Sequence, residues 1–498
     1  MAPLVIWQQS PFGWLFSMLV FVVHLAVVAR AIVRPDRTPT SRIAWVAVIM
    51  TLPLVGIVAY LFIGETSIGR DRVKKLRAVN ERMRRPDEHP DNGLDVPERA
   101  VELFDLGRTI NRFEPRSGNR IRVMGDPDAP ADKPMINSDV AIDALVADIE
   151  AAREHVHLSF YIWLDDHNGG KVADAVCAAA RRGVQCRVMV DDLGSHAFIH
   201  SPRWKQLQDA GVHVHATLND IPRLGHLAIG RVDLRNHRKI VVIDNAIAYC
   251  GSQNCADPQF RVAPKYAPWI DIWLRCEGPL VRQEQYIFLA SWIAVTGESS
   301  LEGLPTAQPA PQTFEGGAIA QMFGTGPTTL DDAMSDMFVA TIFAARDDLV
   351  ITTPYFVPDA ALLRAICAAP RRGVRTTIVF PERNNSPLVG ASCRSTYPSL
   401  LEAGVQVYEY PLGLLHTKTM TLDGEIALVG SANMDRRSLQ LNFENNMVVV
   451  DRDVVAQVRA RQDSYLAVSH RVDPEAVAAW PLRYRLVQNA VGMLGPLL

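Results

Sequence analysis

The sequence is poor in the features that mark secreted, metal-binding and nucleic-acid-binding proteins. Seven cysteines are scattered over 498 residues, which argues against a disulfide framework and favours buried thiols in a reducing compartment. Neither a Cys-x-x-Cys pair nor a His-Glu-x-x-His segment occurs, so we expect no metal and no other cofactor. The formal net charge is only −3, and such a chain lacks the basic field that nucleic acid would require.

Charge is also missing from two N-terminal stretches. Residues 12–29 are apolar except for Ser17 and His24, and residues 43–63 contain no charged side chain. Each stretch approaches the ~20 residues that cross a bilayer core, so the sequence predicts a hairpin of two transmembrane helices over about residues 12–33 and 43–63. A cleaved signal peptide is the poorer interpretation of the first stretch, because no lysine or arginine precedes it and a second apolar stretch follows closely.

Basic residues cluster beside these apolar stretches. Four arginines lie in residues 30–42, between the two expected helices, and eight arginines or lysines lie in residues 70–85. The larger cluster predicts that the N-terminus and the rest of the chain lie on the cytoplasmic side. It also favours contact with anionic lipid head groups, at about 1 kcal/mol per basic residue near the surface.

One motif occurs twice in the remaining chain. His-x-Lys-x-x-x-x-Asp is found as His237, Lys239 and Asp244, and again as His416, Lys418 and Asp423. A Gly-Ser-x-Asn segment begins 14 residues after each histidine (251 − 237 and 430 − 416) and supplies Ser252 and Asn254 in the first copy and Ser431 and Asn433 in the second. Each residue type occurs on average at roughly one position in twenty, so the recurrence of six residues at the same spacing is not due to chance. It indicates two duplicated halves that share one active site.

The residue types in the motif suit the chemistry of a phosphodiester. Residues i and i+2 of a strand share a face, so each histidine and its lysine point to one place. One histidine can attack phosphorus while the other donates and later accepts a proton. The lysines and asparagines, supported by the two serines, would bind the phosphate oxygens. Asp244 and Asp423 fall on the opposite face, where we expect them to anchor a turn.

Each histidine also needs a partner that orients its second ring nitrogen. Asp271 follows His237 by 34 residues (271 − 237), and Glu444 follows His416 by 28 (444 − 416). These spacings make Asp271 and Glu444 the candidates, each for the histidine of its own half.

The pattern around the motifs predicts the domain organisation. Residues 1–66 hold the two apolar helices, residues 67–98 a basic segment and linker, and residues 298–317 a proline-rich linker between the halves. The halves themselves occupy residues 99–297 and 318–498. Apolar strands alternate with helical segments in both, which predicts an α/β fold of two repeated sandwich-like halves.

The duplicated motif resembles the phospholipase D superfamily, and the text around it is similar to bacterial cardiolipin synthases. The similar segments are NHRKIVVIDNAIAYCGSQNCADP, WIDIWLRCEGP, TPYFVP and the stretch from His416 to Glu444. One departure is Cys255, where a larger apolar residue is more usual. A small apolar side chain is tolerable there.

This resemblance implies a phosphatidyltransferase of the bacterial inner membrane. It would join two phosphatidylglycerol molecules into cardiolipin and glycerol through a phosphohistidine, with membrane phospholipids as its partners and no nucleic acid. We assign His237 as the nucleophile and His416 as the general acid and base, and the near-symmetry of the halves leaves the reverse open. The alternatives are a phospholipase D-type hydrolase, a transphosphatidylase with another acceptor alcohol, a nuclease and an inactive lipid-binding scaffold.

Overall fold

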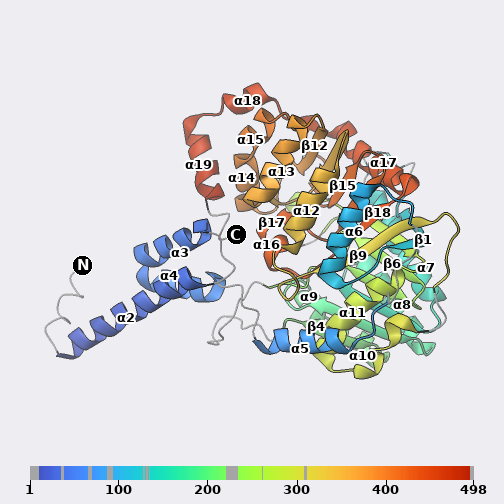
Figure 1. Ribbon diagram of the computed structural model, residues 1–498. Helices are drawn as coiled ribbons and strands as arrows, with labels where there is room; N and C mark the ends of the chain where they lie inside the picture. The colour runs from blue at the N-terminus through green and yellow to red at the C-terminus, as the bar shows by residue number, and fades with distance from the viewer. Residues whose placement is uncertain are drawn as a thin grey trace. The chain divides into compact units, whose positions relative to one another are not determined.

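The computed structural model describes most of the chain. The described residues are 11–34, 39–64, 70–86, 94–126, 129–130, 133, 135–219, 234–260, 262–307 and 311–493. They divide into two compact units, one within residues 1–70 and one that contains nearly all the rest. The second unit carries both motifs and is built on a single mixed sheet (Figure 1).

The sheet contains fifteen strands among the described residues, in the order β19-β13-β12-β10-β15-β16-β18-β9-β1-β8-β6-β5-β2-β3-β4. The strands of the first half are β1 (Arg116–Val123), β2 (His155–Phe160), β3 (Gln185–Asp191), β4 (His213–Thr217), β5 (Ile240–Ile243), β6 (Ile247–Gly251) and β8 (Trp273–Glu277). Those of the second half are β9 (Ala318–Thr325), β10 (Asp348–Thr352), β12 (Arg375–Pro381), β13 (Gln406–Tyr410), β15 (Thr419–Leu422), β16 (Ile426–Gly430), β18 (Glu444–Val450) and β19 (His470–Arg471).

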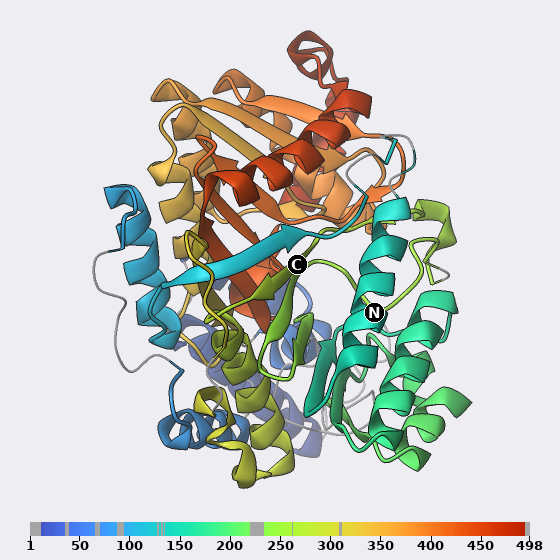
Figure 2. The ribbon, with the colours of Figure 1, turned by 90° about the vertical axis from the view of Figure 1, so that its right-hand side faces the viewer.

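The order of the strands reads nearly the same from both ends, because the two halves are copies. Three neighbouring strands are parallel in each half (β2, β3 and β4; β10, β12 and β13), and β1 joins β9 antiparallel at the centre. Figure 2 shows the second half in orange and red above the green first half. The expected α/β fold with two repeated halves is therefore confirmed, as one continuous mixed sheet.

Helices cover the faces of this sheet. The larger ones in the first half are α7 (Met135–Ala151), α8 (His167–Arg181), α10 (Pro202–Asp209) and α11 (Val281–Thr296), with the short α9 (His196–Ile199). The second half has α12 (Ala333–Ala344), α13 (Ala360–Arg371), α14 (Pro387–Ser395), α15 (Tyr397–Glu402), α16 (Arg436–Gln440), α17 (Arg452–Val468), α18 (Pro474–Ala478) and α19 (Leu482–Gly492). Two more, α5 (Arg70–Arg82) and α6 (Glu98–Asn111), precede the first half.

Local sequence explains why equivalent helices begin and end alike. Asp166 and Asp359 cap α8 and α13 by accepting a hydrogen bond from a backbone N–H of the first turn. Both helices run into an Arg-Arg-Gly turn, where Gly183 and Gly373 adopt positive φ values of 94° and 92°. Glycine tolerates this conformation, so the chain can turn directly into β3 and β12.

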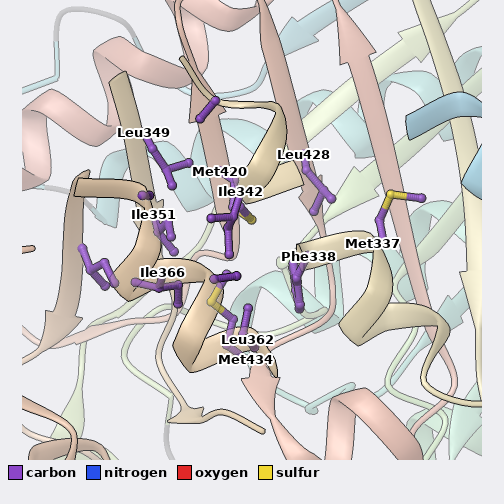
Figure 3. Close-up of a cluster of buried hydrophobic side chains, with 14 of the residues drawn as sticks. Met337, Phe338, Ile342, Leu349, Ile351, Leu362, Ile366, Met420, Leu428 and Met434 are labelled. Atoms are coloured by element: carbon purple, nitrogen blue, oxygen red, sulfur yellow. The ribbon is translucent and has the colours of Figure 1, made fainter. Parts of the chain in front are cut away.

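Each half has its own apolar core, and a third cluster is shared. The second-half cluster includes Leu349, Ile351, Met420 and Leu428 (Figure 3). The shared cluster draws on β5 and β6 of the first half and on β16 and β18 of the second. The two halves are therefore packed as one body.

Helix α6 precedes the first half in sequence but packs against the second half. The sequence placed residues 99–111 in the first half, but Leu103 and Phe104 of α6 are buried in the second-half core. Arg99 of the same helix forms ion pairs with Asp423 and Glu425. Sequence order alone could not reveal that this helix crosses to the other half.

Two short strand pairs also connect the halves. β7 (Trp269–Ile270) runs parallel to β14 (Leu414–Leu415), and an isolated bridge joins Asn236 to Phe443. A third small pair, β11 (Phe356–Val357) with β17 (Met434–Asp435), lies within the second half. The first two connections immediately precede the motif histidines, and they determine the geometry of the site.

The N-terminal unit consists of α2 (Pro11–Val33), α3 (Pro39–Thr51), α4 (Pro53–Ala59) and a π-helical turn (Tyr60–Gly64). The continuous helix expected over residues 43–63 is wrong, because the chain leaves helical geometry at Leu52 before Pro53. Trp45 of α3 then packs edge-on against Tyr60, with ring centroids 5.4 Å apart. Among the described residues, no helix combines the length and apolar character needed to cross a membrane.

Candidate active site

The two motif histidines lie where the chain passes from one half of the sheet to the other. His237 follows the Asn236–Phe443 bridge, and its backbone N–H donates to the carbonyl of Phe443 at 3.0 Å. His416 follows β14, and its N–H donates to the carbonyl of Ile270 at 2.7 Å. Each histidine is thus attached through its main chain to the opposite half.

The same crossing decides which carboxylate each histidine contacts. His237 Nδ1 lies 2.8 Å from Glu444 Oε2, and His416 Nδ1 lies 2.7 Å from Asp271 Oδ1. Asp271 and Glu444 are therefore the contacts that the sequence singled out, but the expected pairing within each half is wrong. An ionised carboxylate at Nδ1 favours the tautomer that leaves Nε2 unprotonated and able to attack.

The two serines hold these carboxylates. Ser252 Oγ donates to Asp271 at 2.6 Å and accepts from the N–H of Ile272. Ser431 Oγ donates to Glu444 and accepts from the N–H of Asn445. The expectation that the serines support phosphate binding is thus corrected, because both hydroxyls are directed at carboxylates.

Burial determines the charge state of the histidines. Burial lowers the pKa of His237 to about 4, a shift that Glu444 only partly opposes. Burial likewise lowers the pKa of His416 to about 3. Burial alone would raise the pKa of Glu444 and Asp271, but the facing histidines and buried lysines hold both below the ordinary value. At neutral pH the empty site therefore contains two neutral imidazoles and two ionised carboxylates.

The two lysines are buried beside the histidines. Lys239 Nζ donates to the carbonyl of His237 at 2.6 Å, and Lys418 Nζ donates to the carbonyl of His416. Burial lowers the pKa of Lys239 to about 8 and holds that of Lys418 well below its ordinary value. Lys418 is also close enough to lower the pKa of His237. The two motifs thus share one electrostatic environment.

Asn254 and Asn433 each keep one amide atom unused. Asn254 Oδ1 accepts from the N–H of Ile162, and Asn433 Nδ2 donates to Ser438, both at 3.3 Å. Asn254 Nδ2 and Asn433 Oδ1 are buried and have no hydrogen-bond partner among the described residues. Buried polar atoms of this kind are normally satisfied, so a ligand in the site is the natural partner.

The motif aspartates lie away from the histidines. Asp244 accepts hydrogen bonds from the backbone N–H groups of Arg153, Glu154 and His155, each at 2.8 Å. Asp423 accepts equivalent bonds from residues 346–348 at 2.8 to 2.9 Å. Asp244 thus connects the end of β5 to the residues at the start of β2, and Asp423 connects the end of β15 to those at the start of β10.

Several contacts of the site were not anticipated. Tyr161, which follows β2, has its ring centroid 4.9 Å from that of His237, and Trp269 lies 4.7 Å from His416. Arg238 donates to the carbonyl of Glu444 and to Ser291. The repeat of the halves gives no signal for Tyr161, because Pro354 occupies its place in the second half. Arg238 has no such signal either, since Thr417 occupies its place in the second motif.

This arrangement is suited to phosphoryl transfer. Two neutral imidazoles share the site, each with a carboxylate able to stabilise a positive charge that develops on the ring. The two buried lysines and the free Nδ2 of Asn254 can donate to the oxygens of a phosphodiester, whereas Asn433 can donate only through Nδ2 because its free Oδ1 is an acceptor.

Comparison with known families agrees with this geometry. A family described as cardiolipin synthase, PLD-like domain, matches residues 145–263 and 338–465, one match in each half. A family described as phospholipase D-nuclease N-terminal matches residues 14–65.

Individual proteins are similar over almost the whole chain. Cardiolipin synthase A of Escherichia coli O157:H7 and that of Salmonella arizonae are each 36% identical over 495 residues, which is 98% of both chains. Among solved structures, the phosphatidylserine synthase of Haemophilus influenzae superposes with a TM-score of 0.56 at 14% identity, covering 79% of this chain and 97% of that one. The last similarity shows a shared fold.

Proposed function

The chain belongs to the cardiolipin synthases, phosphatidyltransferases of the phospholipase D superfamily, and on that premise we propose how it makes cardiolipin. One phosphatidylglycerol donates its phosphatidyl group to a histidine and releases glycerol. A second phosphatidylglycerol accepts the group. The overall reaction is reversible, because it exchanges one phosphate ester of glycerol for another.

In the first step, Nε2 of His237 attacks phosphorus while the bond from phosphorus to the glycerol oxygen breaks. His416, protonated at Nε2, gives its proton to the departing oxygen. Without substrate His416 is neutral at pH 7, so the ring has to take up this proton from solvent as the substrate binds. The negative phosphodiester, together with Asp271, would raise the pKa of His416 when lipid binds.

In the second step, His416 takes the proton from the terminal hydroxyl of the incoming phosphatidylglycerol. The oxygen attacks phosphorus, the bond to His237 breaks, and cardiolipin leaves. Lys239, Lys418, Asn254 and Asn433 stabilise the equatorial oxygens in both steps. His416 again carries the proton at Nε2 and releases it to solvent when cardiolipin leaves, so the atoms balance.

One observation carries this proposal: His237 and His416 each contact an ionised carboxylate of the opposite half inside one buried cluster. The assignment of the nucleophile rests on the finer surroundings of Glu444. That carboxylate accepts from Ser431, Ser438 and Asn442 as well as from His237. Its position is more constrained than that of Asp271, which suits the group that orients a nucleophile.

The N-terminal unit supplies the membrane association that this chemistry needs. Apolar side chains of α2 and α4 are exposed, with Leu19 at 60% and Leu54 at 71%, and a family named for phospholipase D N-termini matches the segment. We place this unit in the bacterial cytoplasmic membrane and the catalytic body on the cytoplasmic side, where the basic residues of α5 meet anionic lipid. Confinement to one surface replaces a search in solution for both lipids.

The test is a lipid assay with labelled phosphatidylglycerol on the full-length protein, with products separated by mass. We expect cardiolipin and glycerol in equal amounts, and a loss of at least ~10³-fold in the His237→Ala and His416→Ala variants. Phosphatidic acid without cardiolipin would identify a hydrolase. Full transfer by either variant would refute the proposed roles, and no turnover of any phosphodiester would leave a lipid-binding scaffold.

A further inference from the structure

A cavity of about 300 Å³ lies beside the catalytic pair, between α5, β4 and α11. Figure 1 shows these three elements close together. Helix α5 is held there by the packing of Val79 in the shared core and by hydrogen bonds between Tyr286 of α11 and Asn80. The wall contains Thr217, the last residue of β4. The carboxyl ends of parallel strands are where open α/β sheets bind ligands.

The cavity reaches the residues next to the reacting groups. Asn236 and Phe443 both line it, and they pair with each other in the bridge between the halves. Asn236 directly precedes His237, and Phe443 directly precedes Glu444. Adjacent residues are separated by only ~3.8 Å between Cα atoms, so the wall of the cavity is continuous with the backbone of the nucleophile.

Two buried polar atoms in the wall have no hydrogen-bond partner among the residues that the structure describes. Asn236 is 5% exposed; its Nδ2 donates to Ser159 at 3.3 Å, whereas its Oδ1 has no hydrogen-bond partner among the described residues. His215 Nε2 is also buried and has no hydrogen-bond partner among the described residues. A buried acceptor without a donor is unfavourable, and a ligand hydroxyl would satisfy it. Burial lowers the pKa of His215, so its neutral ring can either donate or accept.

The remaining wall defines the chemistry of the ligand. Among the described residues no carboxylate lines the cavity. Lys75 of α5 provides a positive charge, and Val295 and Phe443 are apolar. Hydroxyls suit Asn236 and His215, a phosphate suits Lys75, and the start of an acyl chain suits the apolar wall.

We propose that this cavity binds the glycerol-phosphate head group of the acceptor phosphatidylglycerol. The inference rests on the proposed function and names a binding site for the second substrate. Asn236 and His215 hold the glycerol hydroxyls, and Lys75 holds the phosphate. The terminal hydroxyl is thereby presented beside the phosphohistidine, and water is kept from the same place.

The experiment separates the donor from the acceptor. A short-chain phosphatidyl-p-nitrophenol serves as the donor, since nitrophenol leaves without a glycerol and the donor has no hydroxyl to act as acceptor. Phosphatidylglycerol is then varied as the acceptor. We expect His215→Leu and Lys75→Ser to raise the KM for phosphatidylglycerol at least ~10-fold and to lower the ratio of cardiolipin to phosphatidic acid. Nitrophenol release without acceptor should stay within ~2-fold of the wild type.

Two controls guard against indirect effects. Lys74→Ser changes an exposed lysine of the same helix that does not line the cavity, and it should leave the KM unchanged. His215→Gln keeps a polar group in place and should recover most of the loss. If every variant has the wild-type KM for phosphatidylglycerol, the proposal is overturned.

Free glycerol carries the same hydroxyl groups as the lipid head group, so a parallel assay uses glycerol as the acceptor. An effect of His215→Leu on glycerol alone, with phosphatidylglycerol unaffected, would also overturn the lipid assignment. If the wild type makes no cardiolipin at all, the proposed function fails by itself. In that case, the Kd of short-chain phosphatidylglycerol is compared between the His237→Ala variant and the His237→Ala/His215→Leu double variant. A larger Kd for the double variant supports the proposed binding site, and an equal Kd refutes it.

Discussion

Glu444 accepts hydrogen bonds from Ser431, Ser438 and Asn442 in addition to its contact with His237. Asp271 has Ser252 besides His416. The Glu444 side chain is fully buried, that of Asp271 is 5% exposed, and both are ionised. Each can therefore hold one imidazole in a single tautomer and stabilise its charged form. The two residues therefore act on the reaction through the histidines that they position.

Removing the charge of either carboxylate tests this role. Glu444→Gln and Asp271→Asn keep the shape of the side chain but cannot stabilise an imidazolium. We expect kcat to fall by roughly 10²–10⁴-fold in each variant while KM changes little. Steady-state transfer kinetics measure both parameters.

The matched control is Asp105→Asn, the same change on an exposed helix, which should leave kcat unaltered. A variant of Glu444 or Asp271 with wild-type kcat would contradict the positioning role. A loss confined to KM would do so as well, because it would indicate a role in binding alone.

The depressed histidine pKa values predict proton uptake when substrate binds. Both rings are neutral in the empty site, with pKa values of about 4 and 3, whereas the reactive complex needs one imidazolium. Because binding raises the pKa of this histidine, the affinity for the substrate weakens as the pH rises, by up to about tenfold per pH unit. Calorimetry with a non-cleavable phosphonate analogue, in buffers of different ionisation enthalpy, should show about one proton taken up at pH 7.

The His416→Ala variant identifies the group that takes up this proton. When this variant binds the analogue, it should take up about one proton fewer than the wild type does. The His237→Ala variant should take up as many protons as the wild type. Equal uptake in all three proteins would assign the proton to Lys239 or Lys418, whose pKa values burial also lowers.

At this scale the sequence predicted which residues form the site but not which of them meet. The recurring spacing identified the histidines, lysines and asparagines, whereas Asp271 and Glu444 were candidates from their place downstream, at the unequal spacings of 34 and 28 residues. The spacing contains no information on the bridges that carry His237 and His416 to the opposite half, so the crossed pairing could not be derived from it. The serines were misjudged for the same reason, since their carboxylate neighbours follow from that crossing.

At the scale of secondary structure elements, Asp244 and Asp423 fasten the motif strands in equivalent ways. Each carboxylate accepts three backbone N–H groups at the entrance to a neighbouring strand. Hydrogen bonds to a charged acceptor contribute more than neutral ones. These two aspartates therefore stabilise β5 and β15, on which the lysines depend.

Replacing either aspartate should lower stability more than catalysis. We expect Asp244→Ala and Asp423→Ala to reduce Tm by about 3–8 °C, since several charged hydrogen bonds are lost. Asp423→Ala should cost more, because the ion pair with Arg99 is lost too. Thermal unfolding followed by circular dichroism provides the measurement, and activity at 20 °C should remain within ~5-fold. An unchanged Tm with abolished activity would instead place the aspartates in the chemistry.

Elements also show where local patterns mislead. The uncharged run over residues 43–63 predicted one helix, yet Pro53 cannot donate a helical hydrogen bond and ends α3 at Thr51. Helix α6 was assigned by its place in the sequence, whereas its buried face fits the core of the second half. The strands of both halves were predicted more reliably, because their β-branched apolar runs repeat.

At the scale of the whole molecule, the described residues of the catalytic body form one large sheet with five apolar clusters, and the described residues of the N-terminal unit form a cluster of their own. A chain lacking residues 1–66 should therefore fold and keep the active site. Its transfer activity on short-chain phosphatidylglycerol in solution should stay within ~3-fold of the full chain. On lipid vesicles it should fall at least ~10-fold, because the substrates are confined to the bilayer.

Comparison of Tm and vesicle binding between the two chains accompanies this test. Equal activity on vesicles after truncation would show that α5 and the catalytic body suffice for lipid contact. Loss of activity on both substrates together with a lowered Tm would show that the N-terminal unit supports the fold.

The central claim is a covalent phosphohistidine on His237, formed in a site to which both halves contribute. Rapid quench of the full-length protein with labelled phosphatidylglycerol at alkaline pH, followed by peptide mapping, tests it most directly. The account predicts label on the peptide that contains His237, with more accumulating in His416→Ala when the donor is phosphatidyl-p-nitrophenol, whose leaving group needs no proton. Label on His416, or turnover without any labelled histidine, would contradict it.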